Sequence, residues 1–173
     1  MKEVVLGIDL GTSSIKVIAV NQQGDVIESK NASLSLIQEQ SGYSEQDPEA
    51  WFQATKKAII ALMSSSKMKD YDVKGISFSG QMHGLVIVDK DGHVLRNAIL
   101  WNDTRNSEQC RQIIDKFGHR VNENPVLEGF TLPKMLWVQQ HEPNIWKNVD
   151  YFMLPKDYLR YRLTGCLLYT SLM

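Results

Sequence analysis

The sequence has few cysteines, no long apolar run and no excess of charge of one sign. Its two cysteines, Cys110 and Cys166, lie far apart and form no Cys-x-x-Cys pair, which argues against a disulfide framework or a zinc site. No apolar run approaches the roughly 20 residues that span a bilayer. The 19 basic and 20 acidic residues are mixed along the chain, so no basic field indicates nucleic acid or a membrane as a partner. The composition therefore predicts a soluble, cytoplasmic protein with reduced thiols.

Two glycine-rich nucleotide motifs are also missing from the sequence. Neither Gly-x-x-x-x-Gly-Lys-Ser/Thr nor Gly-x-Gly-x-x-Gly occurs, which excludes the P-loop and the dinucleotide-binding fingerprint. The acidic residue at position 3 argues against a secretory signal at the start. What is present is a chain of 173 residues with 43% hydrophobic and 23% charged residues, which is typical of a globular domain with a core.

Three β-rich runs open the chain, at residues 3–9, 15–20 and 26–36. Small or polar residues at 10–14 and 21–25 separate these runs, a pattern typical of tight turns between paired strands. We expect two successive hairpins, and therefore an antiparallel meander.

A helix is predicted to start at residues 47–49, Asp-Pro-Glu. An acidic N-cap followed by proline at the first helical position is a typical start signal. Trp51, Ala54, Ala58 and Leu62 follow at spacings of three and four, so they should form the buried face of this helix.

The rest of the chain alternates between strand-like and helical segments. Strands are expected at residues 73–79, 85–88 and 94–101, and helices at 104–117, 131–138 and 156–163. Thr104 is the expected cap of the first of these helices, and Gly118 and Gly165 are expected stops. This order predicts the α/β class, with a mixed sheet and helices packed against it.

The first candidate site is the turn after the first strand, together with the acid before it. Binding of a phosphate requires backbone N–H groups that can approach closely, and hydroxyl donors add to them. The residues that supply both are Gly11, Thr12, Ser13 and Ser14. Asp9 is placed to hold Mg²⁺ through its water shell, and Lys16 could add positive charge near the phosphates. A polar hairpin turn next to an acid is the alternative, and these residues alone leave both open.

The second candidate site follows the strand expected at 73–79. Gln81, Met82 and His83 offer amide, imidazole and backbone groups that suit the hydroxyls of a sugar. A histidine after a strand is more often a structural residue with its hydrogen bonds satisfied, so this segment is weak evidence by itself.

The third candidate site is Trp101-Asn102-Asp103. Tryptophan offers an apolar face to a sugar ring, while asparagine and aspartate offer directional hydrogen bonds. The alternative is a core tryptophan followed by a helix cap, which explains Thr104 but does not explain Asn102 and Asp103 together.

Taken together, these segments resemble a known family. Residues 7–16, Gly-Ile-Asp-Leu-Gly-Thr-Ser-Ser-Ile-Lys, are similar to the first phosphate motif of the actin-like ATPase superfamily. Five further segments occur in the order and spacing of the FGGY carbohydrate kinases, namely 45–49, 81–84, 99–105, 129–134 and 154–159. The resemblance covers residues 1 to about 165, and Gln-Met-His-Gly with Leu-Trp-Asn-Asp-Thr-Arg is most similar to the branch that acts on xylulose.

The resemblance implies a ribonuclease H-like (actin-like ATPase) fold and an ATP-dependent phosphorylation of a pentulose, with D-xylulose as the expected sugar. Gly11, Thr12, Ser13, Ser14 and Lys16 would bind the phosphates of ATP, and Asp9 would position Mg²⁺. Gln81, Met82, His83, Trp101, Asn102 and Asp103 would line the sugar pocket. A homodimer is left open as the assembly.

The chain departs from the family in two respects. Family members are much longer, so the resemblance places the general base and a carboxy-terminal domain beyond residue 173, and we expect this chain alone to be inactive. Residues 1–165 would be an incomplete amino-terminal kinase domain, and 166–173 an atypical tail from a truncated or frame-shifted reading. A kinase for gluconate, ribulose or another polyol stays open, as does a non-catalytic actin-like nucleotide-binding fragment.

Overall fold

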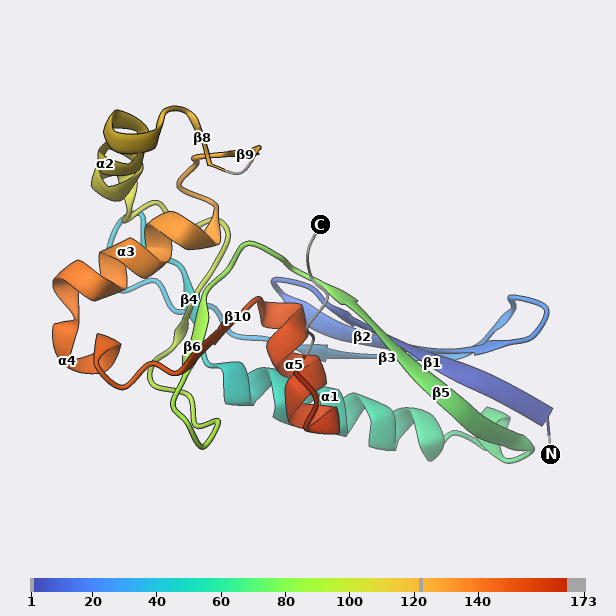
Figure 1. Ribbon diagram of the computed structural model, residues 1–173. Helices are drawn as coiled ribbons and strands as arrows, with labels where there is room; N and C mark the ends of the chain where they lie inside the picture. Colours follow the sequence, from blue (N-terminus) through green and yellow to red (C-terminus); the bar gives the residue numbers. More distant parts are fainter. Residues whose placement is uncertain (1, 122, 168–173) are drawn as a thin grey trace. The chain divides into compact units, whose positions relative to one another are not determined.

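Four strands form the main sheet of the computed structural model, which describes residues 2–121 and 123–167. They are β1 (Lys2–Leu10), β2 (Ser14–Asn21), β3 (Val26–Ser33) and β5 (Tyr71–Gly80), in the spatial order β3-β2-β1-β5 (Figure 1). β1 pairs with β2, and β2 with β3, in antiparallel register, whereas β1 and β5 are parallel. The mixed sheet and the opening meander are therefore confirmed, although the third strand ends at Ser33 and not at 36.

Helix α1 (Pro48–Met63) lies along one face of this sheet (Figure 1). Trp51, Ala58 and Leu62 are buried as predicted, and Ala54 is half-buried. Alternate residues of β1 and β2 are buried with them, because successive side chains of a strand point to opposite faces. A short 3-10 helix, Ser66–Met68, precedes β5 and adds the buried Met68 to this core.

The chain divides into two compact units. The sheet unit comprises Met1–Ser35, Glu49–Gln81 and Leu159–Met173, and the second unit comprises Leu36–Pro48 and Met82–Tyr158. Helix α5 (Pro155–Thr164) contributes residues to both units. It was predicted over 156–163, and Gly165 follows it with a positive φ of 70°, which fits the expected stop.

Short strands and helices make up the second unit. Its strands are β4 (Glu45–Gln46), β6 (Val86–Val88), β7 (Ala98–Ile99), β8 (Arg120–Val121), β9 (Asn124–Pro125) and β10 (Tyr151–Met153). Its other helices are α2 (Ser107–Phe117), α3 (Thr131–His141) and α4 (Pro143–Trp146). The strands pair as β4 with β7, β6 with β10, and β8 with β9. The strand expected over 94–101 is thus reduced to β7, with an isolated bridge between Val88 and Val94.

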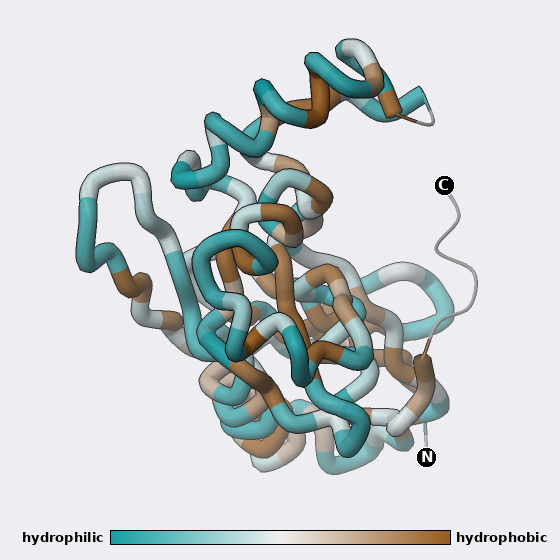
Figure 2. Tube along the Cα trace, turned by 60° about the vertical axis from the view of Figure 1, so that its left-hand side comes forward, coloured by the Kyte–Doolittle hydropathy of each residue, from teal (hydrophilic) through white to brown (hydrophobic). Residues whose placement is uncertain are grey.

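Two hydrophobic clusters stabilise the second unit. The larger contains Leu85, Ile87, Ile99, Trp137 and Val138, and the smaller contains Cys110, Ile113 and Val126. Hydrophilic and hydrophobic residues alternate along α2 (Figure 2), which fits a helix with one buried face.

The start of α2 differs from the prediction. Asn106, and not Thr104, precedes the first turn, and Gly118 follows the last turn at φ 84° as expected. The backbone N–H of Thr104 donates instead to the carbonyl of Gly42, at 2.9 Å. This long-range hydrogen bond holds Thr104 in a loop and delays the helix.

No helix of the described residues is long and apolar enough to cross a membrane. The atypical tail expected at 166–173 lies outside the described residues from position 168 onward. Both cysteines are free thiols, Cys110 buried and Cys166 exposed.

Candidate functional site

The loop between β1 and β2 forms the tip of the first hairpin, as predicted. The backbone N–H of Gly11 donates to the carbonyl of Ser14 at 3.0 Å, which closes the loop, and the carbonyl of Ser13 accepts from Leu34 at 2.9 Å. A Cβ atom on residue 11 would lie only 3.0 Å from the Ser14 carbonyl oxygen, so this tight closure favours glycine. The loop therefore presents small residues in a fixed backbone conformation.

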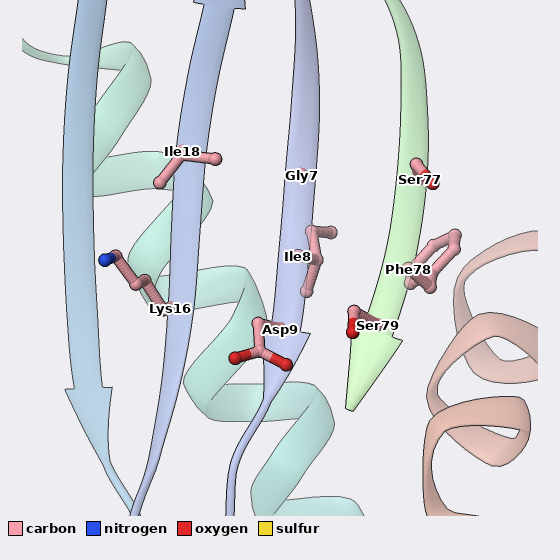
Figure 3. Close-up of a pocket in the computed structure, with 8 residues that line it drawn as sticks. All are labelled: Gly7, Ile8, Asp9, Lys16, Ile18, Ser77, Phe78 and Ser79. Carbon is pink, nitrogen blue, oxygen red and sulfur yellow. The ribbon is translucent and has the colours of Figure 1, made fainter. Parts of the chain in front are cut away.

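A hollow of about 300 Å³ lies beside this hairpin in the sheet unit (Figure 3). It is lined by Gly7, Ile8, Asp9, Lys16, Ile18, Ser77, Phe78 and Ser79. Asp9 and Ser79 lie near the ends of β1 and β5, and the Lys16 side chain extends away from the Asp9 carboxylate (Figure 3). The hollow thus has an acid, a base and hydroxyl groups at its margins.

Asp9 and Lys16 are direct cross-strand partners, and both are exposed. Within residues 2–121 and 123–167, the Asp9 carboxylate makes no hydrogen bond or ion pair. A solvent-facing carboxylate with free oxygens suits a hydrated Mg²⁺, which keeps most of its waters and takes one or two carboxylates. The residues present therefore fit the expected metal.

The segment Gln81–Gly84 begins where β5 ends. The backbone N–H of Gln81 donates to the carbonyl of Leu10, at 2.7 Å. Gly80 precedes it, and a Cβ there would lie 2.7 Å from the Cβ of Leu10, so β5 and β1 approach too closely for any larger residue. Met82 is 48% exposed, and His83 adopts a left-handed backbone conformation with φ 65°.

Trp101, Asn102 and Asp103 follow β7 but differ in exposure. Trp101 is 49% exposed and Asn102 is exposed, whereas Asp103 is completely buried. The Asp103 carboxylate accepts from the backbone N–H of Ser44 at 2.6 Å and from the Arg105 guanidinium at 2.7 and 2.9 Å. Both carboxylate oxygens are used within the fold, so a sugar pocket in this segment depends mainly on Trp101 and Asn102.

Arg105 connects Asp103 to a buried ion-pair cluster. Its guanidinium also contacts Glu45 at 2.7 Å and lies 3.7 Å from the centre of the Tyr43 ring. Arg96 pairs with the same Glu45 and with Glu142. Burial lowers the pKa of Arg105, but its hydrogen bonds and attraction to Asp103 and Glu45 outweigh this effect and raise the pKa overall. The cluster fixes the backbone on either side of Trp101.

The segment 128–131 contacts both candidate sugar segments. The Phe130 ring packs on His83, with ring centres 4.3 Å apart, and the Thr131 hydroxyl donates to the His83 carbonyl at 3.1 Å. A Cβ on Gly129 would lie 3.0 Å from the carbonyl oxygen of Trp101. Phe130 was not among the predicted site residues, although the family motif at 129–134 contains it.

The structure therefore places the predicted residues in two groups. The hairpin residues, Asp9, Lys16 and Gln81 belong to the sheet unit. Met82, His83, Trp101, Asn102 and Asp103 belong to the second unit, where His83 and Trp101 share contacts with one loop.

Comparison with known proteins identifies relatives over almost the whole chain. A xylulose kinase from Staphylococcus epidermidis is 73% identical over 164 residues, which are 95% of this chain and 33% of that protein. A xylulose kinase from Bacillus subtilis is 56% identical over 164 residues, covering 93% of this chain and 33% of the relative. The chain thus spans about a third of the length of these relatives.

A solved structure gives the same result for the fold. The crystal structure of a xyloylose kinase from Brucella ovis superimposes with a TM-score of 0.89 at 38% sequence identity, covering 94% of this chain and 34% of that chain. The expected fold, a ribonuclease H-like (actin-like ATPase) domain with a mixed sheet and packed helices, is confirmed. Residues 4–171 match the N-terminal domain of one family along nearly their whole length. The chain belongs to the FGGY family of carbohydrate kinases.

Proposed function

We propose that this chain is the amino-terminal part of an ATP-dependent kinase that phosphorylates D-xylulose to xylulose 5-phosphate. The observation that carries the choice of sugar is the identity to two xylulose kinases, 73% and 56% over 164 residues each. The exposed Trp101 and Asn102 and the fixed backbone of His83 support a sugar site in the second unit.

Each group of residues has its own task in this proposal. The backbone N–H groups and hydroxyls of Gly11, Thr12, Ser13 and Ser14 bind the phosphates of ATP, and Lys16 adds positive charge. Asp9 would hold Mg²⁺ through water, where the ion would supply positive charge to the phosphates. Gln81, Met82, His83, Trp101 and Asn102 bind the sugar, and Asp103 holds their loop in place.

The reaction transfers the γ-phosphoryl group of ATP to a hydroxyl of the sugar. The hydroxyl oxygen forms a bond to phosphorus, the bond from phosphorus to the β,γ-bridging oxygen breaks, and ADP leaves. A carboxylate accepts the hydroxyl proton, and we place that base in the carboxy-terminal part of the full-length parent. Such transfer depends mainly on positioning and charge neutralisation, which are the tasks assigned to these residues. We also propose a cytoplasmic location, and leave a homodimer open.

Measuring ADP release by the full-length parent tests the proposal. The parent is assayed with ATP, Mg²⁺ and one of D-xylulose, D-ribulose, gluconate or glycerol, and the product is identified by mass spectrometry. We expect the highest kcat/KM with D-xylulose and a pentulose phosphate as its product. A higher kcat/KM with another substrate would assign the enzyme to that sugar, and binding of ATP without any sugar-dependent turnover would favour a non-catalytic nucleotide-binding protein.

A further inference from the structure

His83 occupies a backbone conformation that a histidine rarely adopts. Its φ of 65° lies in the left-handed region, where a side chain crowds its own backbone. Such a residue persists only where its surroundings hold it. The Thr131 hydroxyl provides one restraint, since it donates to the His83 carbonyl at 3.1 Å. Gly84 provides another, because a Cβ there would lie 2.8 Å from Pro155 and the chain after His83 is therefore tightly packed.

The His83 side chain has a restraint of its own. The Phe130 ring lies against the imidazole, with centres 4.3 Å apart and planes inclined by 34°. Both side chains are half-buried, so one part of the imidazole is covered while the residue keeps access to solvent. An aromatic ring at this distance limits rotation of the imidazole about its side-chain bonds.

Phe130 is in turn fixed by its position before α3. Its backbone N–H donates to the carbonyl of Leu127 at 3.0 Å. Its carbonyl accepts from the Lys134 ammonium at 3.3 Å, and the same ammonium donates to the Glu128 carbonyl at 2.5 Å. The amide of Asn106 donates to the Glu128 carbonyl as well, at 3.0 Å.

Lys134 is an unusual residue for this task because it is completely buried. A buried ammonium loses its hydration and is tolerated only where hydrogen bonds compensate. Here its two backbone acceptors both belong to the segment that carries Phe130, so Lys134 connects α3 to this segment. Three residues of the motif at 129–134, namely Phe130, Thr131 and Lys134, therefore contact His83 or hold a residue that does.

We infer that Phe130 is a positioning residue, which orients the His83 imidazole for the sugar and is itself held by the buried Lys134. This inference rests on the proposed function, because it assigns His83 to sugar binding. Phe130 touches no reacting atom in this account. Its effect passes through His83, so it should alter the affinity for sugar and leave the affinity for ATP unchanged.

The test uses the full-length parent with Phe130→Leu, which removes the ring, and Phe130→Tyr, which keeps it. We expect Phe130→Leu to raise the KM for D-xylulose about fivefold to tenfold, which lies within the range expected for loss of an aromatic contact. The KM for ATP should stay within about twofold of wild type. Phe130→Tyr keeps the ring, so this variant should have the wild-type KM for sugar.

Two further variants separate positioning from stability. Ile113→Ala removes buried carbon from the cluster of Cys110, Ile113 and Val126, which does not include His83 or Phe130, and should leave both KM values unchanged. Thr131→Val removes the hydroxyl that bonds the His83 carbonyl and should raise the KM for sugar in the same direction. This second variant decides the question if Phe130→Leu does not fold.

The outcomes are distinguishable. If wild-type parent turns over D-xylulose and both Phe130→Leu and Thr131→Val keep its KM for sugar, the inference is wrong and the proposed function stands. Equal rises in the KM for ATP and for sugar would also overturn it, because positioning of His83 predicts a selective effect. A wild-type parent without sugar-dependent turnover would overturn the proposed function, and this inference with it.

Discussion

At the scale of single residues, a substitution of Asp9 tests the proposed phosphate site directly. Replacing Asp9 by alanine in the full-length parent should lower kcat by roughly 10²–10³-fold, because an electrostatic partner of the transition state is lost. The measurement is steady-state ADP release at saturating ATP, Mg²⁺ and sugar. Asp72→Ala is the matched control. Asp72 lies near the opposite end of the same sheet, and it forms a surface ion pair with Lys74. Unchanged turnover in Asp9→Ala would remove Asp9 from the site.

Lys134 gives a pH-dependent prediction at the same scale. Burial lowers the pKa of Lys134 from 10.5 to about 8. Between these values the unfolded chain binds more protons than the folded chain, so the free energy of unfolding should rise with pH. The neutral amine still has two hydrogens for the carbonyls of Glu128 and Phe130, so its hydrogen bonds persist.

The measurement is urea unfolding of wild type and Lys134→Met at about pH 7 and about pH 10. Wild type should gain about 2–3 kcal/mol relative to the variant over this interval, because one proton is bound with a pKa of 10.5 in the unfolded chain and about 8 in the folded chain. The comparison with the methionine variant cancels the titration of other groups. A parallel pH dependence of the two proteins would show that Lys134 has an ordinary pKa.

Single residues also show where sequence reasoning falls short. Asn102 and Asp103 looked equivalent in the sequence, yet one is exposed and the other buried against Arg105 and Ser44. Thr104 was the expected helix cap, but its backbone N–H donates to the carbonyl of Gly42, and this hydrogen bond keeps Thr104 outside the helix. Ser44 and Gly42 lie 59 and 62 positions away from Asp103 and Thr104 in the sequence, so no local pattern could reveal these two contacts.

At the scale of elements, helix α1 provides the clearest prediction of stability. Trp51 is completely buried in the core of the sheet unit, as the spacing of its apolar residues predicted. Trp51→Ala should lower the free energy of unfolding of the chain by about 3–5 kcal/mol, because it removes a large side chain and leaves a cavity. Chemical denaturation beside Lys57→Ala, an exposed position on the same helix, measures the difference. A loss below about 1 kcal/mol would show that α1 does not pack as described.

The long elements were predicted well, whereas among the short ones β6 was predicted, over 85–88, and β4 and α4 were not. The meander, α1, α2, α3 and α5 have a hydrophobic period or a start and stop signal within themselves. By contrast, β4 and β7 have two residues each and exist because Glu45 and Gln46 pair with residues more than 50 positions away. Helix α4 has four residues, too few to show a period. Tertiary pairing, and not local propensity, forms these elements.

At the scale of the whole molecule, the chain matches the N-terminal domain of the FGGY carbohydrate kinases. It covers about a third of its relatives, and it contains candidate residues for ATP phosphates and for sugar. Both groups required the combined motifs of the family, because the small residues at the hairpin tip alone leave a phosphate site and a polar turn both open. Phe130 needed the structure, since only its contact with His83 distinguishes it from a core aromatic residue.

The most direct measurement compares sugar-dependent ADP release by the 173-residue chain and by the full-length parent, with D-xylulose, ATP and Mg²⁺. We expect turnover by the parent and none by the chain. The general base is placed in the carboxy-terminal part of the parent, and that part must also close on the bound nucleotide to exclude water and align the reacting atoms. Loss of the base alone should cost roughly 10²–10⁴-fold. Turnover by the chain within about tenfold of the parent would show that residues 1–173 contain the base, and would contradict this division of the catalytic machinery.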